Sequence, residues 1–413
     1  MSGLLGFTER FGTEMELSDF VSRVLRDTGR HFGYSQIGIP IMERASSYSE
    51  EVVGSSPWPG WKRKGCFFFD IQNYNSSYDE VPTSEHVLLI PEGTLSVTRW
   101  LGEQLGRGTI SFPIKMLYNL TCYRNELMDT LSQTKHKEFT QFGLEILGSK
   151  NPHSDTEILC IAVNCLCNLG IQLSEIRIRL NDITIFNQLI KESHLENRSV
   201  EIKELLDTLS EEKAKYGIKS ANDTLTALKS IFDQENLSPV LRNKWDSLIL
   251  QQNYDITDAR VQLGESYAPM LDYLQEVRNA FVAYNIPLVI DLCVIRSHEY
   301  YTSVSYEIDV QTTTDTYIEI AGGGRYDRLV SSFVPPDCPI QQVSCTGFAF
   351  GVERVINILK NEHLIGVNTQ ITSAFYFNQP LQMVYPKDTS ISAYLEAYSS
   401  AKDANQPTSV WIG

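Results

Sequence analysis

The sequence of 413 residues lacks long apolar runs, a basic excess and a signal-like start. No stretch approaches the roughly 18 uninterrupted apolar residues of a transmembrane helix, so we expect no membrane span. The formal net charge is −16, which argues against a broad nucleic-acid surface but leaves a local basic groove open. The first residues carry glutamates and do not form a basic-then-apolar signal pattern.

Common signatures of nucleotide binding and covalent catalysis are also missing. There is no Walker A sequence and no G-x-G-x-x-G fingerprint at a strand-to-helix turn. The seven histidines are scattered, and no Ser-His-Asp or Cys-His motif stands out. These absences argue against a P-loop enzyme, a dinucleotide-binding enzyme and an enzyme with an activated nucleophile.

The eight cysteines lie mostly in apolar or strand-like surroundings. Cys165 and Cys167 are too close together for the usual zinc spacing and have no partner pair. We therefore expect buried free thiols in a reducing compartment, which implies a cytoplasmic location.

The chain is long enough for more than one domain, because single cores stop growing at about 250–300 residues. We expect a core in two parts, 1–183 and 283–365, separated by a helical, heavily charged insertion at 184–282. The insertion mixes both signs of charge, which favours a solvated helical face over a nucleic-acid stripe. The tail, 366–413, reads as strand, strand, helix (390–404) and strand, like a fragment of an α/β unit.

Alternating patterns predict antiparallel strands at 112–123 and 138–147, joined by a long polar loop as a hairpin. A third alternating segment, 175–180, predicts a half-exposed strand. On the second hairpin strand the residues of one face suit the floor of a polar pocket better than a core. These residues are Phe139, Gln141, Gly143 and Glu145.

The segment 320–329 reads Ile-Ala-Gly-Gly-Gly-Arg-Tyr-Asp-Arg-Leu. Three consecutive glycines let the backbone approach a ligand or a second strand, because no Cβ intervenes. Two interpretations stay open for the glycines: a β-bulge capped by a surface Arg-Asp pair, or one wall of a ligand pocket.

Arginines and glutamates follow several strands and strand ends. The planar fork of arginine suits phosphate or carboxylate, and glutamates among arginines suit an ammonium group, a magnesium ion or an imidazole N–H. The pattern indicates a nucleoside triphosphate and an amino acid held together. The set comprises Glu92, Arg124, Glu126, Gln141, Glu145, Arg296 and Arg354.

Several segments together resemble one family. Ile-Pro at 39–40, Tyr-Arg-Asn-Glu at 123–126 with 139–145, and Gly-Phe-Ala-Phe-Gly-Val-Glu-Arg at 347–354 are similar to motifs 1, 2 and 3 of class II aminoacyl-tRNA synthetases. Further similarity, to segments peculiar to histidyl-tRNA synthetases, is found in Pro-Glu-Gly-Thr at 91–94, in 296–301 and in 321–327. The chain resembles the catalytic domain of the histidine enzymes over roughly residues 10–365.

This resemblance implies an α+β fold: a class II synthetase-type antiparallel sheet flanked by helices, with a helical insertion. It implies ATP-dependent activation of histidine, or a close analogue, as the aminoacyl-adenylate, and transfer to an acceptor, by default tRNA. ATP and Mg²⁺ would be the cofactors, and the motif 1 proline implies a homodimer. The segment 366–413 would be a truncated or degenerate anticodon-domain-like α/β fragment.

The resemblance also assigns an ATP site. Arg124 and Arg354 would hold the α- and γ-phosphates of a bent ATP and act in catalysis, and Phe139 would stack on adenine. Glu126 would help to hold the adenine or a magnesium ion. Lys137 stands in this site where the family tends to have arginine.

The amino-acid site implied by the resemblance is larger. Its catalytic residue is Arg296, which would hold the histidine carboxylate and stabilise charge as the carboxylate attacks the α-phosphorus. From the residues alone, a surface ion pair for Glu145 and core packing for the two tyrosines at 300–301 stay open. Glu92, Thr94 and Gln141 would bind the α-amino group, Glu145 and Tyr301 the imidazole, and Tyr300, Gly323, Gly324, Arg325 and Tyr326 would line the pocket.

The motif 2 loop is longer than is typical of the family and carries Asp129, and this changed loop and the net charge of −16 leave the acceptor open between tRNA and another molecule. Ile90 is a further departure, because it replaces the arginine before Pro-Glu-Gly-Thr. A second hypothesis is a catalytically silent paralogue that senses histidine as a regulatory subunit of ATP phosphoribosyltransferase. The short tail fits that hypothesis, whereas the retained Arg124, Arg296 and Arg354 favour the enzyme.

Overall fold

A computed structural model describes residues 4–54, 65–73, 83–125, 136–150, 152–216, 221–250, 255–282, 286, 288–296, 300–361, 382–384 and 408–410. Glu126, most of the motif 2 loop and the helix expected at 390–404 lie outside these residues. Of the tail, a parallel pair of short strands is described, β12 (Gln382–Val384) and β13 (Thr408–Val410).

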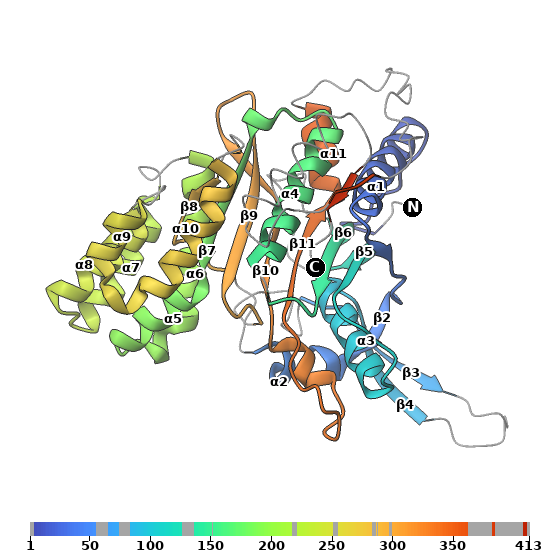
Figure 1. Cartoon of the computed structure of the whole chain (residues 1–413), viewed down its shortest axis with the longest axis horizontal. Helices are drawn as coiled ribbons and strands as arrows, with labels where there is room; N and C mark the ends of the chain where they lie inside the picture. Colours follow the sequence, from blue (N-terminus) through green and yellow to red (C-terminus); the bar gives the residue numbers. More distant parts are fainter. Residues whose placement is uncertain are drawn as a thin grey trace.

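An eight-stranded, mostly antiparallel sheet forms the centre of the molecule (Figure 1). Its order is β1-β5-β6-β11-β10-β9-β7-β8, with parallel pairing at the two ends, between β1 and β5 and between β7 and β8. This sheet with its flanking helices confirms the expected α+β, class II synthetase-type fold. The strands are β1 (Ser35–Gln36), β5 (Ile114–Tyr123), β6 (Glu138–Leu147), β7 (Ile176–Asp182), β8 (Leu288–Ile290), β9 (Val304–Gln311), β10 (Tyr317–Arg325) and β11 (Cys345–Gly351).

Three helices cover one face of the sheet: α1 (Thr13–His31), α4 (Pro152–Asn168) and α11 (Val352–Asn361). Helix α1 is amphipathic, and its buried side chains recur every four residues, as Leu17, Val21 and Leu25. Acidic residues in its first turn and basic residues in its last turn match the helix dipole. The larger of the two hydrophobic cores lies under these helices.

The opposite face carries α3 (Thr94–Gly106), the 3₁₀ turn η7 (Leu329–Phe333), the 3₁₀ turn η1 (Ala45–Tyr48) and the short helix α2 (Glu50–Val53). A three-stranded sheet in the order β2-β4-β3 adjoins them, and a second core lies here. The alternation predicted for 138–147 is confirmed, because Phe142, Leu144 and Ile146 lie in the larger core and Phe139 and Leu147 in or against the second. The small sheet comprises β2 (Met42–Arg44), β3 (Phe68–Asn73) and β4 (Thr83–Leu89).

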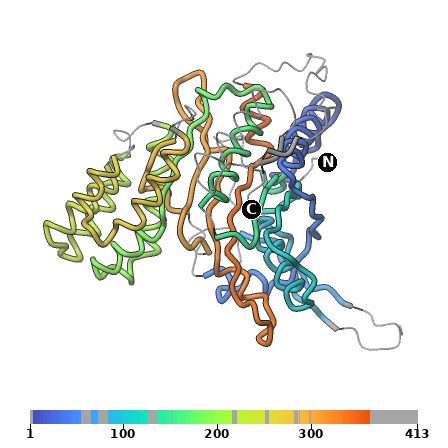
Figure 2. The backbone as a smooth tube through the Cα atoms, in the orientation of Figure 1, coloured from blue at the N-terminus to red at the C-terminus, as the bar shows by residue number. Residues whose placement is uncertain are grey.

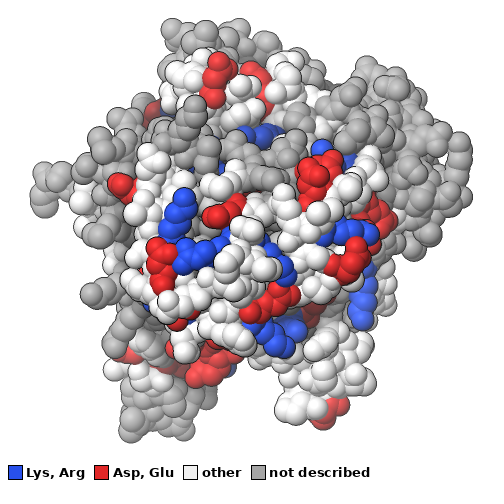
Figure 3. Space-filling model, turned by 90° about the vertical axis from the view of Figure 1, so that its left-hand side faces the viewer, with Lys and Arg blue, Asp and Glu red and all other residues white. Residues whose placement is uncertain are grey.

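Between β7 and β8 the chain forms a set of α-helices, α5 to α10, which we call the helical unit. Figure 2 shows this green-to-yellow stretch at the β7–β8 end of the sheet, away from the blue α1. On the face of the molecule in Figure 3, lysines and arginines lie among aspartates and glutamates, without a stripe of one sign among the described residues. The helices are α5 (Ile183–Glu192), α6 (Ser199–Tyr216), α7 (Asn222–Gln234), α8 (Pro239–Leu250), α9 (Ile256–Leu263) and α10 (Ala268–Val282).

Strand β7 corrects one expectation, because the half-exposed strand predicted at 175–180 is in fact buried on both faces. Its isoleucines and Leu180 belong to the larger core. Its other face carries Arg177 and Arg179, and α6 of the helical unit covers it with Ser210. The side chains of β7 alternate between the two faces as predicted, but the polar ones contact protein instead of water.

All eight cysteines are free, six of them buried and two half-buried, as the sequence predicts. None of the described helices is long and apolar enough to cross a membrane.

Candidate active site

Glu145, near the C-terminal end of β6, lies at the centre of the candidate site and is 1% exposed. It accepts hydrogen bonds from Tyr326 Oη at 2.7 Å, Thr94 Oγ1 at 3.1 Å and Tyr118 Oη at 3.2 Å. Burial raises the pKa of Glu145 to about 8, against the effect of the hydrogen bond from Tyr326, and nearby Glu92 raises it further. The surface ion pair considered for Glu145 is therefore excluded.

Glycines on neighbouring strands make room for this pocket floor. Gly347 lies opposite Glu145 in the pairing of β11 with β6, and a Cβ there would lie 1.6 Å from Glu145 Oε2. Gly143 lies opposite Tyr118, and a Cβ there would lie 2.2 Å from the tyrosine ring. Any larger residue at either position would displace a group that binds or holds Glu145.

The segment before α3 joins the same pocket. Glu92 is buried and accepts hydrogen bonds from the backbone N–H groups of Thr94 at 2.7 Å and Leu95 at 2.8 Å. Gln141 Oε1 accepts from the N–H of Gly93 at 2.7 Å. Burial raises the pKa of Glu92 although these hydrogen bonds oppose the shift. The three residues expected at an α-amino group thus converge beside the start of α3.

The guanidinium of Arg296 lies over the glycines of β10. Its Nη1 donates to Glu319 Oε1 at 2.8 Å and to Glu307 Oε1 at 3.2 Å. A Cβ on Gly322 would lie 2.3 Å from Nη1, so the glycine allows this close approach. Burial alone would lower the pKa of Arg296, but the two carboxylates raise it, and the group remains a cation.

Arg354, in the first turn of α11, reaches the same carboxylate. Its Nη1 donates to the backbone oxygen of Glu319 at 3.1 Å and lies 3.9 Å from Oε2 of that residue. Glu319 therefore lies between Arg296 and Arg354. Two of the three predicted catalytic arginines meet at this one residue.

The third arginine, Arg124, lies at the end of β5. Its Nε donates to the backbone oxygen of Pro91 at 3.0 Å, and its guanidinium carbon lies 4.6 Å from the centre of the Phe139 ring. Lys137 Nζ donates to Asn125 Oδ1 at 2.9 Å. The predicted ATP-binding residues that the structure describes on β5 and β6 are thus neighbours.

The tyrosines predicted to line the pocket form one aromatic group. The ring centres of Tyr300 and Tyr301 are 4.8 Å apart, and those of Tyr300 and Tyr326 are 6.2 Å apart. Burial raises the pKa of Tyr301 to about 12. A Cβ on Gly324 would lie 2.9 Å from the ring of Tyr301. Tyr300 and Tyr326 also belong to the second core, so core packing and pocket lining coincide here.

Two residues expected at the amino-acid site lie elsewhere, because side chains alternate along β10. A Cβ on Gly323 would meet the ring of Tyr306, which belongs to the larger core. Arg325 Nη2 donates to Asp155 Oδ2 on α4 at 2.7 Å, on the face covered by α1, α4 and α11. The glycine against Arg296 is Gly322 instead.

Sequence reasoning overlooked several residues that shape the site. Tyr118 could have been found from its position on the same strand face as the core residues Met116 and Leu120. Gly347 was visible within the motif 3-like segment. No local signal marked the two carboxylates beside Arg296, since their role depends on the pairing of β9 and β10. The overlooked set is Tyr118, Glu307, Glu319, Gly322 and Gly347.

Magnesium has no assigned protein ligand. Within the part of the chain that the structure describes, no group of three or more histidines, cysteines, aspartates and glutamates could hold a metal ion. Glu126, the candidate from the sequence, lies outside that part.

Comparison with known proteins identifies the family of this chain. The profile of the family described as histidyl-tRNA synthetase matches residues 78–355. This chain belongs to the histidyl-tRNA synthetase family. A histidine–tRNA ligase of Listeria innocua is 30% identical over 346 residues, covering 84% of this chain and 71% of the relative. A second ligase, from Listeria monocytogenes, is 28% identical over 342 residues, covering 83% and 70%.

Solved structures share the fold of this histidyl-tRNA synthetase family member. One is a protein of Bacillus halodurans described as an ATP phosphoribosyltransferase regulatory subunit/histidyl-tRNA synthetase. It superposes with a TM-score of 0.66 at 17% identity, covering 99% of this chain and 92% of the other. At this identity the likeness shows the fold alone.

Proposed function

We propose that this chain activates histidine, or a close analogue, with ATP as an aminoacyl-adenylate and passes it to an acceptor, by default tRNA. The observation that carries the proposal is the buried carboxyl group of Glu145. None of the described lysines and arginines forms an ion pair with it, and three hydroxyl groups fix its position. A fixed, poorly solvated carboxyl group is a strong hydrogen-bonding partner for an imidazole, and the charge of a bound imidazolium would draw its raised pKa down again.

Different residues of the pocket would bind the different groups of histidine. Glu145 and Tyr301 would read the imidazole, and Glu92, Thr94 and Gln141 would bind the α-amino group. Arg296 would hold the carboxylate, which requires the substrate to share or replace the contact with Glu319. Tyr300, Gly324 and Tyr326 would form the wall of the pocket.

In the reaction, a carboxylate oxygen of histidine would attack the α-phosphorus of ATP. A new O–P bond forms, the bond between the α-phosphorus and its bridging oxygen breaks, and pyrophosphate leaves. Arg124 and Arg354 would hold the phosphates, Phe139 the adenine, and Arg296 would stabilise the charge that develops. Catalysis then rests on positioning and electrostatics, with no covalent intermediate on the protein. Magnesium would enter with ATP.

A second candidate is a histidine-sensing regulatory subunit of ATP phosphoribosyltransferase. Its specific support is the Bacillus halodurans structure, whose description names both possibilities. Against it stand Arg124, Arg296 and Arg354, because a sensor of histidine alone has no use for arginines at a triphosphate site.

The test is exchange of radiolabelled pyrophosphate into ATP by the purified chain, with each amino acid in turn and with and without bulk tRNA. We expect exchange with histidine only, and charging of tRNA would identify the acceptor. Histidine binding without exchange, together with co-purification of a phosphoribosyltransferase, would support the regulatory subunit instead. Exchange with an amino acid other than histidine would refute the role assigned to Glu145.

A further inference from the structure

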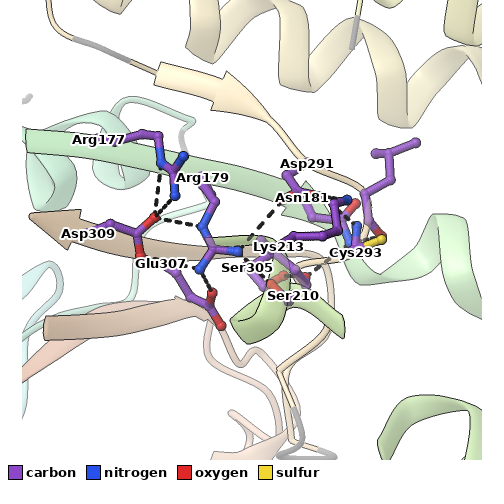
Figure 4. A network of polar contacts seen from close by, with 12 residues as sticks. Arg177, Arg179, Asn181, Ser210, Lys213, Asp291, Cys293, Ser305, Glu307 and Asp309 are labelled. Atoms are coloured by element: carbon purple, nitrogen blue, oxygen red, sulfur yellow. Dashed lines mark hydrogen bonds and ion pairs between the residues drawn. The ribbon is translucent and has the colours of Figure 1, made fainter. Parts of the chain in front are cut away.

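A buried cluster of charges joins the sheet to α6 of the helical unit (Figure 4). At its centre Arg179 of β7 is 3% exposed. The guanidinium donates through Nε to Asp309 Oδ2 at 2.7 Å, through Nη2 to Glu307 Oε2 at 2.5 Å, and through Nη1 to Ser210 Oγ at 2.5 Å. It also lies 3.7 Å from Asp291 Oδ2. Strand β9, helix α6 and the residue that follows β8 therefore surround its guanidinium.

Glu307 connects Arg179 to the candidate active site. One of its carboxylate oxygens accepts from Arg179, and the other accepts from Arg296 Nη1 at 3.2 Å. Arg296 is more exposed, at 18% of its side chain, and also donates to Glu319. Arg179 is thus one carboxylate removed from the arginine assigned to the substrate and has little surface with which to touch the substrate itself.

The backbone that carries Arg296 is anchored to the same strands. Asn181 Nδ2 donates to the carbonyl oxygens of Leu292 at 3.3 Å and Val294 at 3.1 Å. Ser305 Oγ donates to the oxygen of Val294 at 3.0 Å. Asn181 and Ser305 are paired on β7 and β9, two positions along from the pair formed by Arg179 and Glu307 and on the same face. One short stretch of β7 and β9 therefore holds both the guanidinium of Arg296 and the backbone that leads to it.

Helix α6 contacts β7 at one point and the segment after β8 at another. Ser210 accepts the hydrogen bond from Arg179, and Lys213 Nζ donates to Asp291 Oδ1 at 3.3 Å. The other contact of Asp291 Oδ1 is the N–H of Cys293, three residues before Arg296. Ser210 and Lys213 lie three positions apart on the helix, so one face of α6 supplies both contacts.

Charges of both signs meet in and beside the cluster. The cations are Arg177, Arg179, Lys213, Arg296 and Arg354, and the carboxylates are Asp291, Asp309, Glu307 and Glu319, with Asp207 of α6 near Arg296. If Arg179 were neutral, Glu307 would keep Arg296 as its remaining cation among these contacts. The carboxylate would then pull Arg296 toward β9, away from Glu319 and Arg354.

From this geometry we propose that Arg179 is a positioning residue for Arg296, and that Ser210 on α6 makes its orientation depend on the docking of the helical unit. This inference rests on the proposed activation of histidine at Arg296. It assigns the helical unit a role in the first reaction step, independent of any contact with an acceptor.

The decisive comparison uses Arg179→Met against Arg177→Met. Arg177 lies on the same strand and shares Asp309 at 2.8 Å, but it packs on the Tyr317 ring and does not contact Glu307. Both variants should lose stability because each leaves Asp309 with one partner fewer. Arg179→Met should lower kcat for histidine-dependent exchange by about 100-fold with KM for ATP nearly unchanged, since a small misplacement of a reacting group has that effect. Arg177→Met should keep kcat within about twofold of wild type.

Two milder variants keep the test valid if Arg179→Met does not fold. Arg179→Lys retains the charge but cannot reach Ser210, Glu307 and Asp309 together, and Ser210→Ala removes the contact from α6. Each should lower kcat by about 10-fold. The control on the same helix is Thr208→Ala, whose exposed hydroxyl bonds only to the oxygen of Glu204 at 2.9 Å. Unchanged kcat in Arg179→Lys and Ser210→Ala would overturn the proposal.

A binding measurement separates this proposal from the proposed function. Calorimetry gives the affinity of each variant for histidine and for histidinol, which lacks the carboxylate that Arg296 would hold. We expect the preference for histidine over histidinol to fall by about 10-fold in Arg179→Met and to persist in Arg177→Met. If the wild-type chain binds histidine but catalyses no ATP–pyrophosphate exchange, the synthetase activity is refuted. The ratio of the affinities for histidine and histidinol then still tests the positioning role. Equal ratios in both variants would refute the positioning role.

Discussion

At the scale of single residues, the site depends on groups that are polar, buried and fixed by neighbours. Glu145 is the clearest case, because strand alternation predicts its face and the structure adds the hydroxyl groups that hold it. The glycine opposite it, Gly347, shows what the sequence alone does not convey. Gly347 matters because it has no Cβ, which leaves room for the Glu145 side chain. The pairing of β11 with β6 brings the two residues together, and the local sequence does not show this pairing.

The raised pKa of Glu145 has a consequence for stability. The folded protein holds the proton more tightly than the unfolded chain, so its contribution is complete below about pH 4.5 and is lost as the pH rises toward 8. Glu145→Gln removes this loss. Relative to wild type, the variant should gain up to about 1.4 kcal/mol of unfolding free energy per pH unit across that range. Urea unfolding of both proteins at pH 5.5, 6.5 and 7.5 measures the difference, and a constant difference would contradict the assignment.

Gly347→Ala tests the pocket floor. The added Cβ would lie 1.6 Å from Glu145 Oε2, so the carboxylate must move. We expect histidine affinity to fall by at least about 10-fold and stability by about 1–3 kcal/mol, as for other overpacked sites. Calorimetric titration with histidine measures the first effect and urea unfolding the second.

The control for that variant is Gly351→Ala on the same strand, where a Cβ would meet only the Arg354 side chain at 3.7 and 3.8 Å. This ordinary contact should leave histidine affinity within about twofold of wild type. Equal losses in both variants would show that β11 tolerates no side chain and would remove the special role of Gly347.

At the scale of elements, patterning predicted much of the fold. The alternation of apolar residues located β5 and β6 to within two residues, and the resemblance supplied the arrangement of the sheet. Patterning was wrong where residues distant in sequence determine which side chains are buried or face the site. The second face of β7 meets α6, and the glycines of β10 alternate between Arg296 and Tyr306, so which glycine faces the site depends on strand pairing.

Arg325 makes a contact between a strand and a helix that the segment 321–327 did not predict. It joins the end of β10 to α4 through Asp155, whose side chain is fully buried. Arg325→Ala should cost about 3–5 kcal/mol, because Asp155 would remain as a buried charge without this partner. The exposed pair of Arg44 and Glu85 offers a control, and Arg44→Ala should cost less than about 1 kcal/mol. Similar unfolding free energies for the two variants would contradict the structural role of Arg325.

At the scale of the whole molecule, we expect a homodimer formed through the small β2-β4-β3 sheet. Pro40 precedes this sheet, which exposes Met42 at 48% and Phe69 at 46%, next to Ile41 at 45%. Sedimentation velocity at micromolar concentration should show a dimer, and the double substitution Met42→Lys, Phe69→Lys should shift it to a monomer. Val261→Lys, an exposed position on α9, is the control. A monomeric wild-type chain would contradict the expectation.

At this scale the structure also connects the candidate pocket to the helical unit. A sheet face holds the candidate pocket, and the helical unit reaches that face through the cluster around Arg179. If the cluster positions Arg296, the helical unit influences amino-acid activation before any acceptor binds. The family relationship alone would not distinguish an active enzyme from a histidine sensor with the same pocket.

The most direct test of the central claim is ATP–pyrophosphate exchange by the wild-type chain with and without histidine, beside Arg296→Ala. The account predicts exchange that requires histidine in wild type and is abolished in Arg296→Ala, while ATP binding and the fold persist. No exchange by the wild-type chain with any amino acid, or equal exchange in Arg296→Ala, would contradict it.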